Sequence, residues 1–191
     1  MRRLILLVLS SGLLGLMGNA SMPAQQAPPP LPPPVKDEVL AKMVGTWRAA
    51  GEMGGQKYVD TVRARWGLNR QFVITDVKTS DANDSKKVLY EGHGLMRYDT
   101  DKKQYVMHWF DAYGSMQIFA GELKDNLLTL TSKGAKRTEQ LTFTLGKGSY
   151  KLSMDVSEGD GPMKREWETT YTKVKPAAVT PGAAAPNQNK P

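Results

Sequence analysis

At residues 150–171 the chain reads YKLSMDVSEGDGPMKREWETTY. On both sides of the Gly-rich centre, large side chains alternate with charged or small polar ones. A period of two is typical of a β-strand with one buried face. The Gly159-Asp160-Gly161 turn is too short to hold a crossover helix, so the two strands must be antiparallel. The expected inward sets are Tyr150, Leu152, Met154 and Val156 on the first strand, and Arg165, Trp167, Thr169 and Tyr171 on the second.

The same pattern extends through most of the chain. Strands are predicted at 46–53, 56–66, 70–78, 87–98, 103–111, 115–123, 126–132, 136–145, 149–157 and 163–174, separated by short turns rich in Gly, Asn and Asp. Before them, residues 35–44 place Val39, Leu40 and Met43 on one face of a short helix, which Gly45 ends. Ten antiparallel strands cannot remain a flat open sheet with one buried face, and closure removes the free edges. The predicted fold is all-β: a single antiparallel up-and-down β-barrel of about ten strands with one short N-terminal helix.

The two ends of the chain differ in composition from the middle. Residues 1–20 combine paired arginines, an apolar run and a Gly-Asn-Ala end, which is the pattern of a signal peptide. The apolar run is shorter than the ~20 residues that span a bilayer. We expect a cleaved signal, with an uncleaved anchor as the alternative. Residues 21–35 form a Pro-rich linker, 36–175 the barrel domain and 176–191 a disordered tail.

Composition excludes several classes of function. The chain has no cysteine, which excludes disulfides, thiol catalysis and Cys-ligated metal centres. Its 26 basic residues outnumber 19 acidic ones and give a net charge of +7, but the two kinds are mixed along the barrel segment. Nucleic-acid binding favours clustered bases with interleaved aromatic residues. We therefore expect no nucleic-acid partner. The predicted signal peptide indicates a periplasmic or secreted location, and we expect no stable membrane insertion after its cleavage.

An ordered series of motifs resembles a known group of proteins. Gly45-Thr46-Trp47 follows the helix, and later come Gly92-His93-Gly94, the turn at 98–102, Trp109-Phe110-Asp111-Ala112-Tyr113-Gly114 and Gly121. The series is similar to a bacterial calycin-like family of unknown function, with lipocalin-like and nitrobindin-like barrels as relatives. The resemblance implies that Trp47 plugs the barrel floor. In nitrobindins a histidine from the C-terminal part of the barrel holds haem, but here no histidine follows His108. We therefore expect no haem and no other cofactor.

The two histidines, His93 and His108, are the only candidates for a metal site. If the turn at 99–102 closes an even hairpin, His93 faces His108 and Gly92 faces Trp109. Glu91 then faces Phe110 on the same side as the histidines. Since a metal normally needs three convergent protein ligands, we expect none to be bound.

Large aromatic and Met side chains are the candidates for a ligand cavity. They are Trp47, Met107, Trp109, Met154, Trp167 and Tyr171, with Asp111 and Arg165 as polar members. Asp76 is a further candidate for an inward carboxylate, with Arg63, Arg65 or Arg165 as counter-charge. The same large side chains would equally fill a small barrel without a cavity.

Three hypotheses about function follow. The first is an exported barrel that binds a small apolar or amphipathic ligand. The second is a filled barrel that acts as a structural or interaction protein of the cell envelope. The third is an enzyme that uses the same cavity, with Asp111 and a histidine as acid and base. The chain offers no nucleophile motif and few histidines, so we rank the enzyme below the other two. The ligand and the oligomeric state are left open.

Overall fold

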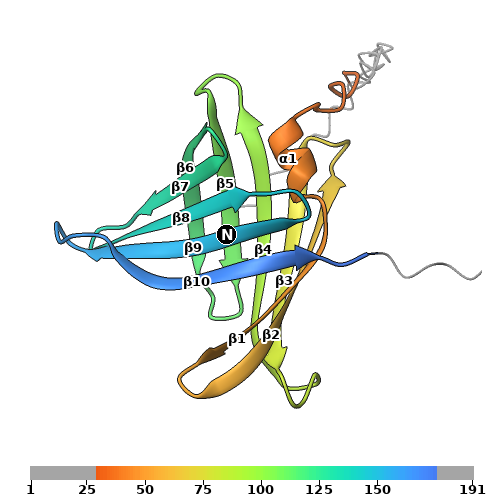
Figure 1. The fold of residues 1–191 in the computed structure, drawn as a ribbon. Coiled ribbons are helices and arrows are strands. Elements are labelled where there is room, and N and C mark those ends of the chain that lie inside the picture. The colour runs from red at the N-terminus through yellow and green to blue at the C-terminus, as the bar shows by residue number, and fades with distance from the viewer. Residues whose placement is uncertain (1–28, 176–191) are drawn as a thin grey trace, which may run out of the picture. The chain divides into compact units, whose positions relative to one another are not determined.

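The structure, a computed structural model, describes residues 29–175, and in this range it contains one short helix and ten strands (Figure 1). Each strand is hydrogen-bonded to its neighbours in the sequence, and β1 also pairs with β10, so the sheet is a closed antiparallel barrel. The predicted up-and-down barrel is confirmed. The elements are α1 (Glu38–Met43), β1 (Gly45–Met53), β2 (Gln56–Gly67), β3 (Phe72–Asp81), β4 (Val88–Asp99), β5 (Gln104–Asp111), β6 (Met116–Lys124), β7 (Leu127–Lys133), β8 (Arg137–Leu145), β9 (Ser149–Glu158) and β10 (Lys164–Lys173).

The predicted signal peptide and the predicted C-terminal tail lie outside the described residues. Both therefore stay predictions. The end of the Pro-rich segment is described, and it is hydrogen-bonded to the barrel. The carbonyl oxygens of Pro32 and Pro33 accept hydrogen bonds from the side-chain amides of Asn69 (2.7 Å) and Gln71 (2.8 Å) in the β2–β3 turn.

Helix α1 closes one end of the barrel. The Asp37 side chain caps it by accepting the Leu40 amide at 2.8 Å, and the same carboxylate accepts the Tyr105 hydroxyl of β5 at 3.2 Å. The Trp47 indole donates to the carbonyl oxygen of Met43 at 2.8 Å, which satisfies one of the free carbonyls at the helix end. Leu40 is fully buried, so the helix is part of the core.

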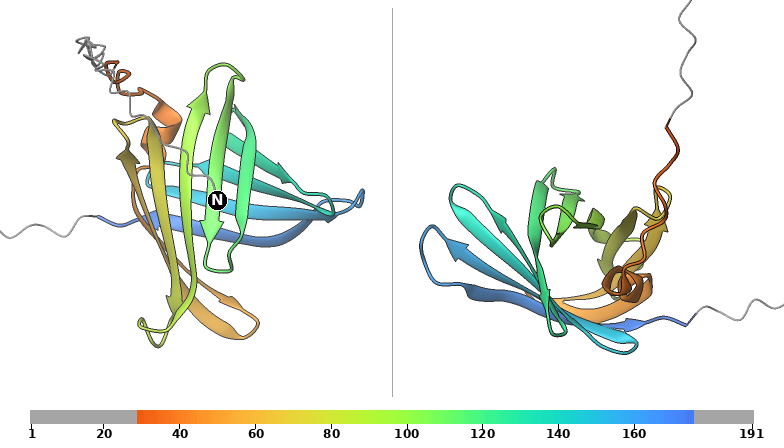
Figure 2. Two further views of the ribbon diagram at one scale, coloured as in Figure 1. Left: turned by 180° about the vertical axis from the view of Figure 1, so that it is seen from behind. Right: turned by 90° about the horizontal axis from the view of Figure 1, so that it is seen from above.

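The core occupies the half of the barrel next to α1. Inward side chains there are buried: Trp47, Val73, Met96, Tyr105, Met107, Phe119, Leu128, Phe143, Tyr150 and Tyr171. In the other half, the inward side chains of Val77, Trp109, Met154 and Trp167 remain partly exposed although they pack against the same core. The buried inward side chains thus lie toward α1, and the partly exposed ones lie toward the end where β1 turns into β2. Figure 2 shows α1 and the β1–β2 hairpin at opposite ends of the barrel. We call the two parts the filled half and the open half.

The β4–β5 register differs from the predicted one by two residues. Gly94, and not Gly92, pairs with Trp109, while His93 pairs with Phe110. His108 takes a different partner, so the expected His93–His108 pair is wrong.

The turn between β4 and β5 explains this shift. The Asp99 carboxylate accepts the amides of Asp101 and Lys102 at 3.1 and 3.2 Å, and Lys103 adopts a left-handed φ of 54°. Asp99 therefore belongs to the strand, and the connection runs from Thr100 to Lys103. A shift of two residues preserves the face of every side chain, so Gly92 and Trp109 still share one face of the sheet.

A β-bulge overturns the predicted orientation of Arg165. The β9–β10 register shifts between Arg165 and Trp167, which leaves Glu166 as an extra residue. Trp167 faces inward as predicted. Arg165 lies on the outer surface, where its guanidinium contacts Asp155 at 2.7 Å and also Glu168. The alternating sequence carried no sign of the extra residue.

Candidate functional site

The open half is lined by large apolar side chains from opposite walls of the barrel. Met154 on β9 pairs with Trp167 on β10, and both are only partly buried. Trp109 on β5 and Val77 on β3 face them from the other wall. Inward apolar surface that stays in contact with water is the ordinary lining of a small-molecule site.

Two glycines hold the Trp109 ring against its wall. A Cβ atom at Gly92 would lie 2.2 Å from this ring, and one at Gly94 would lie 3.0 Å from it. The indole rests on these two backbones and donates to the Tyr90 hydroxyl at 3.0 Å. Burial raises the pKa of Tyr90, so its hydroxyl keeps its proton at neutral pH. The Gly-x-Gly motif therefore allows the Trp109 ring to pack directly on the β4 backbone.

Asp60 on β2 is a buried carboxylate at the boundary of the two halves. Its residue exposure is 8%, and its Oδ2 accepts the Tyr171 hydroxyl at 2.9 Å. Its Oδ1 is buried and has no hydrogen-bond partner among residues 29–175. Buried carboxylate oxygens are nearly always paired, so this one requires an explanation.

The tyrosine that donates to Asp60 belongs to a group of packed aromatic rings. The Tyr171 ring stacks on the Tyr150 ring with 4.8 Å between their centroids. The Trp47 ring meets Tyr150 edge-on, with 5.0 Å between the centroids. Burial, followed by the negative charge of Asp60, raises the pKa of Tyr171 far above its usual range. Tyr171 therefore stays protonated and remains the hydrogen-bond donor to Asp60.

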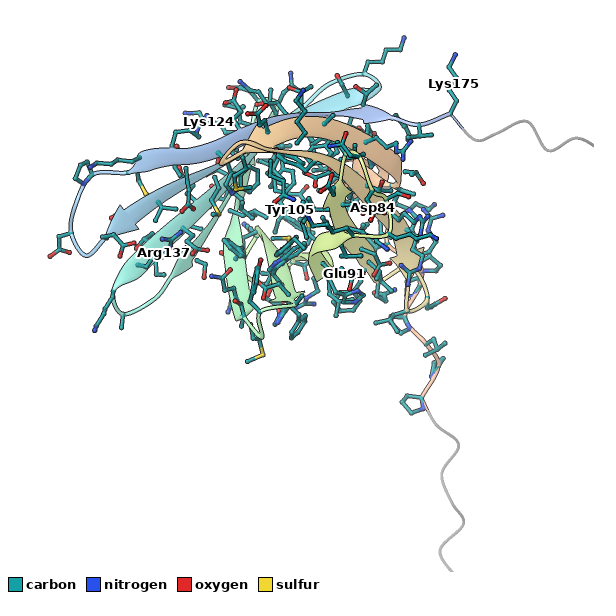
Figure 3. All side chains as sticks on the ribbon, turned by 90° about the horizontal axis from the view of Figure 1, so that it is seen from below. Asp84, Glu91, Tyr105, Lys124, Arg137 and Lys175 are labelled. Carbon is teal, nitrogen blue, oxygen red and sulfur yellow. The ribbon has the colours of Figure 1, made fainter. Side chains whose placement is uncertain are left out.

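Charged side chains gather at the edge of the open half. Arg137 on β8 binds three carboxylates, those of Glu139 at 2.7 Å, Glu158 at 3.1 Å and Glu166 at 2.9 Å. Gln117 on β6 donates to Glu139 at 2.8 Å and joins β6 to this group. Figure 3 shows Arg137 toward the β7–β8 hairpin, away from Tyr105 in the middle of the view. This network forms a polar rim beside the apolar lining.

A groove of about 650 Å³ lies across β2–β5, and Val77 is among its lining residues. Asp76 stands in it, contrary to the expected inward position, and binds Arg65 and His93 at 2.7 Å each. Although partial burial alone would raise the pKa of Asp76, the hydrogen bonds from His93 and Arg65 lower it. The three side chains are about half exposed, which makes them a solvent-screened surface network.

The acid–base pair of the enzyme hypothesis is not supported by the geometry. The Asp111 carboxylate accepts the backbone amides of Tyr113 at 2.9 Å and Ser115 at 3.1 Å, so it caps the β5–β6 turn. Gly114 completes that turn with a φ of 80°. His93 is engaged by Asp76. Among residues 29–175 no three His, Asp or Glu side chains are placed to hold a metal ion.

The predicted cavity residues thus fall into three groups. Trp109, Met154 and Trp167 are inward and partly exposed in the open half, and Tyr171 is buried below them at 5% exposure. Trp47 and Met107 are buried in the filled half, at 3% and 5% exposure. The two polar candidates lie elsewhere: Arg165 is on the outer surface, and Asp111 caps the β5–β6 turn.

Sequence reasoning missed Asp60. The available signal was its place in β2, where it shares the inward parity of Tyr58, Val62 and Ala64. An acidic residue in such a row faces the interior.

Comparisons with known proteins give one family, and the first of two similar solved structures supports the fold. The model of a family described as "Protein of unknown function (DUF1579)" matches residues 33–173. Rv2717c from M. tuberculosis has a similar crystal structure: 14% identity over 72% of this chain and 96% of that one, TM-score 0.55. An S-type phycobiliprotein lyase, CPES from Guillardia theta, is 9% identical over 72% of this chain and 92% of that one, with a TM-score of 0.45. No curated protein matches. The expected family of unknown function is confirmed, while its bacterial, lipocalin-like character stays a prediction.

Within residues 29–175, no helix has the length and apolar character that crossing a membrane requires.

Proposed function

The chain belongs to the DUF1579 family, whose function is unknown, and from its own residues we propose that it binds a small apolar or amphipathic ligand in the open half of the barrel. One observation carries the proposal. Inward Trp109, Met154 and Trp167 stay partly exposed beside a filled core. A barrel evolved only as a scaffold gains stability by burying these side chains, at about 25 cal/mol per Å² of apolar surface.

The polar rim and Asp60 make the site amphipathic. The apolar body of a ligand would lie against Met154 and the two tryptophans, while the Arg137 network faces the entrance. Such a division, with few polar groups fixing the orientation of a mostly apolar ligand, is common in small-molecule sites.

A neutral fluorescent probe, N-phenyl-1-naphthylamine, tests this proposal. We expect binding with a micromolar dissociation constant, roughly −8 kcal/mol, and a change in tryptophan emission. Met154→Trp should fill the cavity and weaken probe binding at least tenfold with the fold intact. The matched control is Met116→Trp, at a position 74% exposed on the outer surface, which should bind the probe as the wild type does.

A filled barrel gives the opposite result. Met154→Trp would then overpack the core and destabilise the protein by about 1–3 kcal/mol, with no probe binding to lose. That outcome, measured by urea unfolding beside the probe titration, would leave a structural or interaction role in place of ligand binding.

We propose in addition that the protein is exported. The paired arginines, the apolar run and the Gly18-Asn19-Ala20 end support cleavage after Ala20. N-terminal sequencing of protein from the native cell envelope should begin at Ser21. A retained Met1 would contradict cleavage and favour a membrane-anchored protein.

A further inference from the structure

The unpartnered oxygen of Asp60 indicates the chemistry of the ligand. Asp60 is more than nine-tenths buried, and Tyr171 satisfies only one of its two oxygens. Within residues 29–175 no Lys, Arg or His side chain forms an ion pair with it. A buried, unpaired carboxylate is costly, and this cost falls when a cation arrives.

The surroundings of Asp60 suit a cation that also has an apolar part. The Tyr171 ring, whose hydroxyl reaches the carboxylate, stacks on Tyr150, and Tyr58 lies two residues before Asp60 on the inward face of β2. Aromatic faces attract ammonium groups, most strongly where water is excluded. An anionic ligand group would instead meet the like charge of Asp60.

Tyr58 lies between Asp60 and the β1–β2 turn on the inward face of β2. Its hydroxyl reaches Thr169 on β10 at 3.5 Å, longer than an ordinary hydroxyl hydrogen bond. Between these strands β1 carries Gly51, where a Cβ atom would lie 2.5 Å from the Tyr58 hydroxyl. The β1–β10 ladder covers only Trp47 and Arg48. The β1–β10 backbone pairing therefore does not extend to Gly51, and Tyr58 reaches β10 through the long contact to Thr169.

We propose that the site takes a protonated amine on an apolar body, with the ammonium group at Asp60 and the body against Met154 and Trp167. This inference rests on the proposed function, since it names the ligand class of the same site. Tyr58 turns aside to admit the amine, and Tyr171 keeps its hydrogen bond to the second carboxylate oxygen.

Three ligands of equal chain length test the proposal: octylamine, octanol and octanoate, each displacing the neutral probe from the full chain at pH 7. Octylamine should displace the probe at a concentration at least tenfold lower than octanol, and octanoate should be the weakest. In the Asp60→Asn variant, octylamine should no longer displace the probe at a lower concentration than octanol. The concentration at which octanol displaces the probe should stay the same as in the wild type. The variant should melt at a Tm no lower than the wild type, because a neutral amide replaces an unpaired buried charge.

The outcomes separate the two proposals. If the probe binds but octanol and octanoate displace it as well as octylamine does, the amine inference is overturned and the ligand-binding barrel stands. An Asp60→Asn protein that keeps the amine preference would also overturn it, and a Tm lowered by more than about 5 °C would then make Asp60 structural. If the wild type binds neither the probe nor any of the three ligands, both proposals fail. The preference measured on the wild type needs no variant, so it remains decisive if Asp60→Asn does not fold.

Discussion

Replacing Trp47 with alanine is expected to lower the free energy of unfolding by about 3–5 kcal/mol, the usual cost of truncating a large buried aromatic residue. Trp47 is 3% exposed, donates to the Met43 carbonyl and contacts the Tyr150 ring edge-on at 5.0 Å. The substitution leaves a cavity where the helix meets the barrel and removes the donor that satisfies the helix end.

Urea unfolding followed by circular dichroism measures this loss. The matched control is Trp66→Ala, because Trp66 is only partly buried and carries Arg70 on its ring at 4.9 Å. The control should lose distinctly less stability. A loss below about 1 kcal/mol for Trp47→Ala would show that Trp47 does not plug the barrel.

Gly121→Ala is expected to cost about 3 kcal/mol, at the upper end of overpacking costs. A Cβ atom at Gly121 would lie 1.9 Å from the Thr129 carbonyl oxygen and 3.1 Å from the Leu130 Cα atom. Both obstacles are backbone, so strands β6 and β7 would have to move apart and strain their ladder. No rotation of a side chain can relieve the contact.

The neighbouring substitution Glu122→Ala provides the control. Glu122 is exposed, and its truncation should change stability by no more than about 0.5 kcal/mol. Equal stability of Gly121→Ala and Glu122→Ala would contradict the close approach of the two strands.

The sequence predicts the barrel well because alternation with a period of two needs only local information. The inward faces of β4, β5 and β9 follow from it, and the error of two residues in the β4–β5 register leaves those faces unchanged. Register depends on the turn, and the left-handed Lys103 could not be read from the sequence.

The site was less predictable, for two physical reasons. The bulge at Glu166 reverses the face of Arg165, and one extra residue in an otherwise regular strand leaves no periodic trace. The Asp60–Tyr171 hydrogen bond joins residues 111 positions apart, so only the closed barrel brings them together. By contrast, the inward orientation of Trp109, Met154 and Trp167 follows from the alternation along each strand alone.

The motifs that suggested a family serve the fold. Asp99 and Asp111 each accept two backbone amides in tight turns, and Gly92 and Gly94 seat the Trp109 ring. Because these residues build hairpins and one wall, they identify the barrel without identifying its ligand.

Native mass spectrometry of the full protein purified from its own host tests the central claim most directly. We predict the mass of the chain plus one small molecule, which is released on denaturation and is missing from Met154→Trp protein purified in the same way. A ligand-free mass for the wild type, together with no binding of the neutral probe, would contradict the ligand-binding barrel.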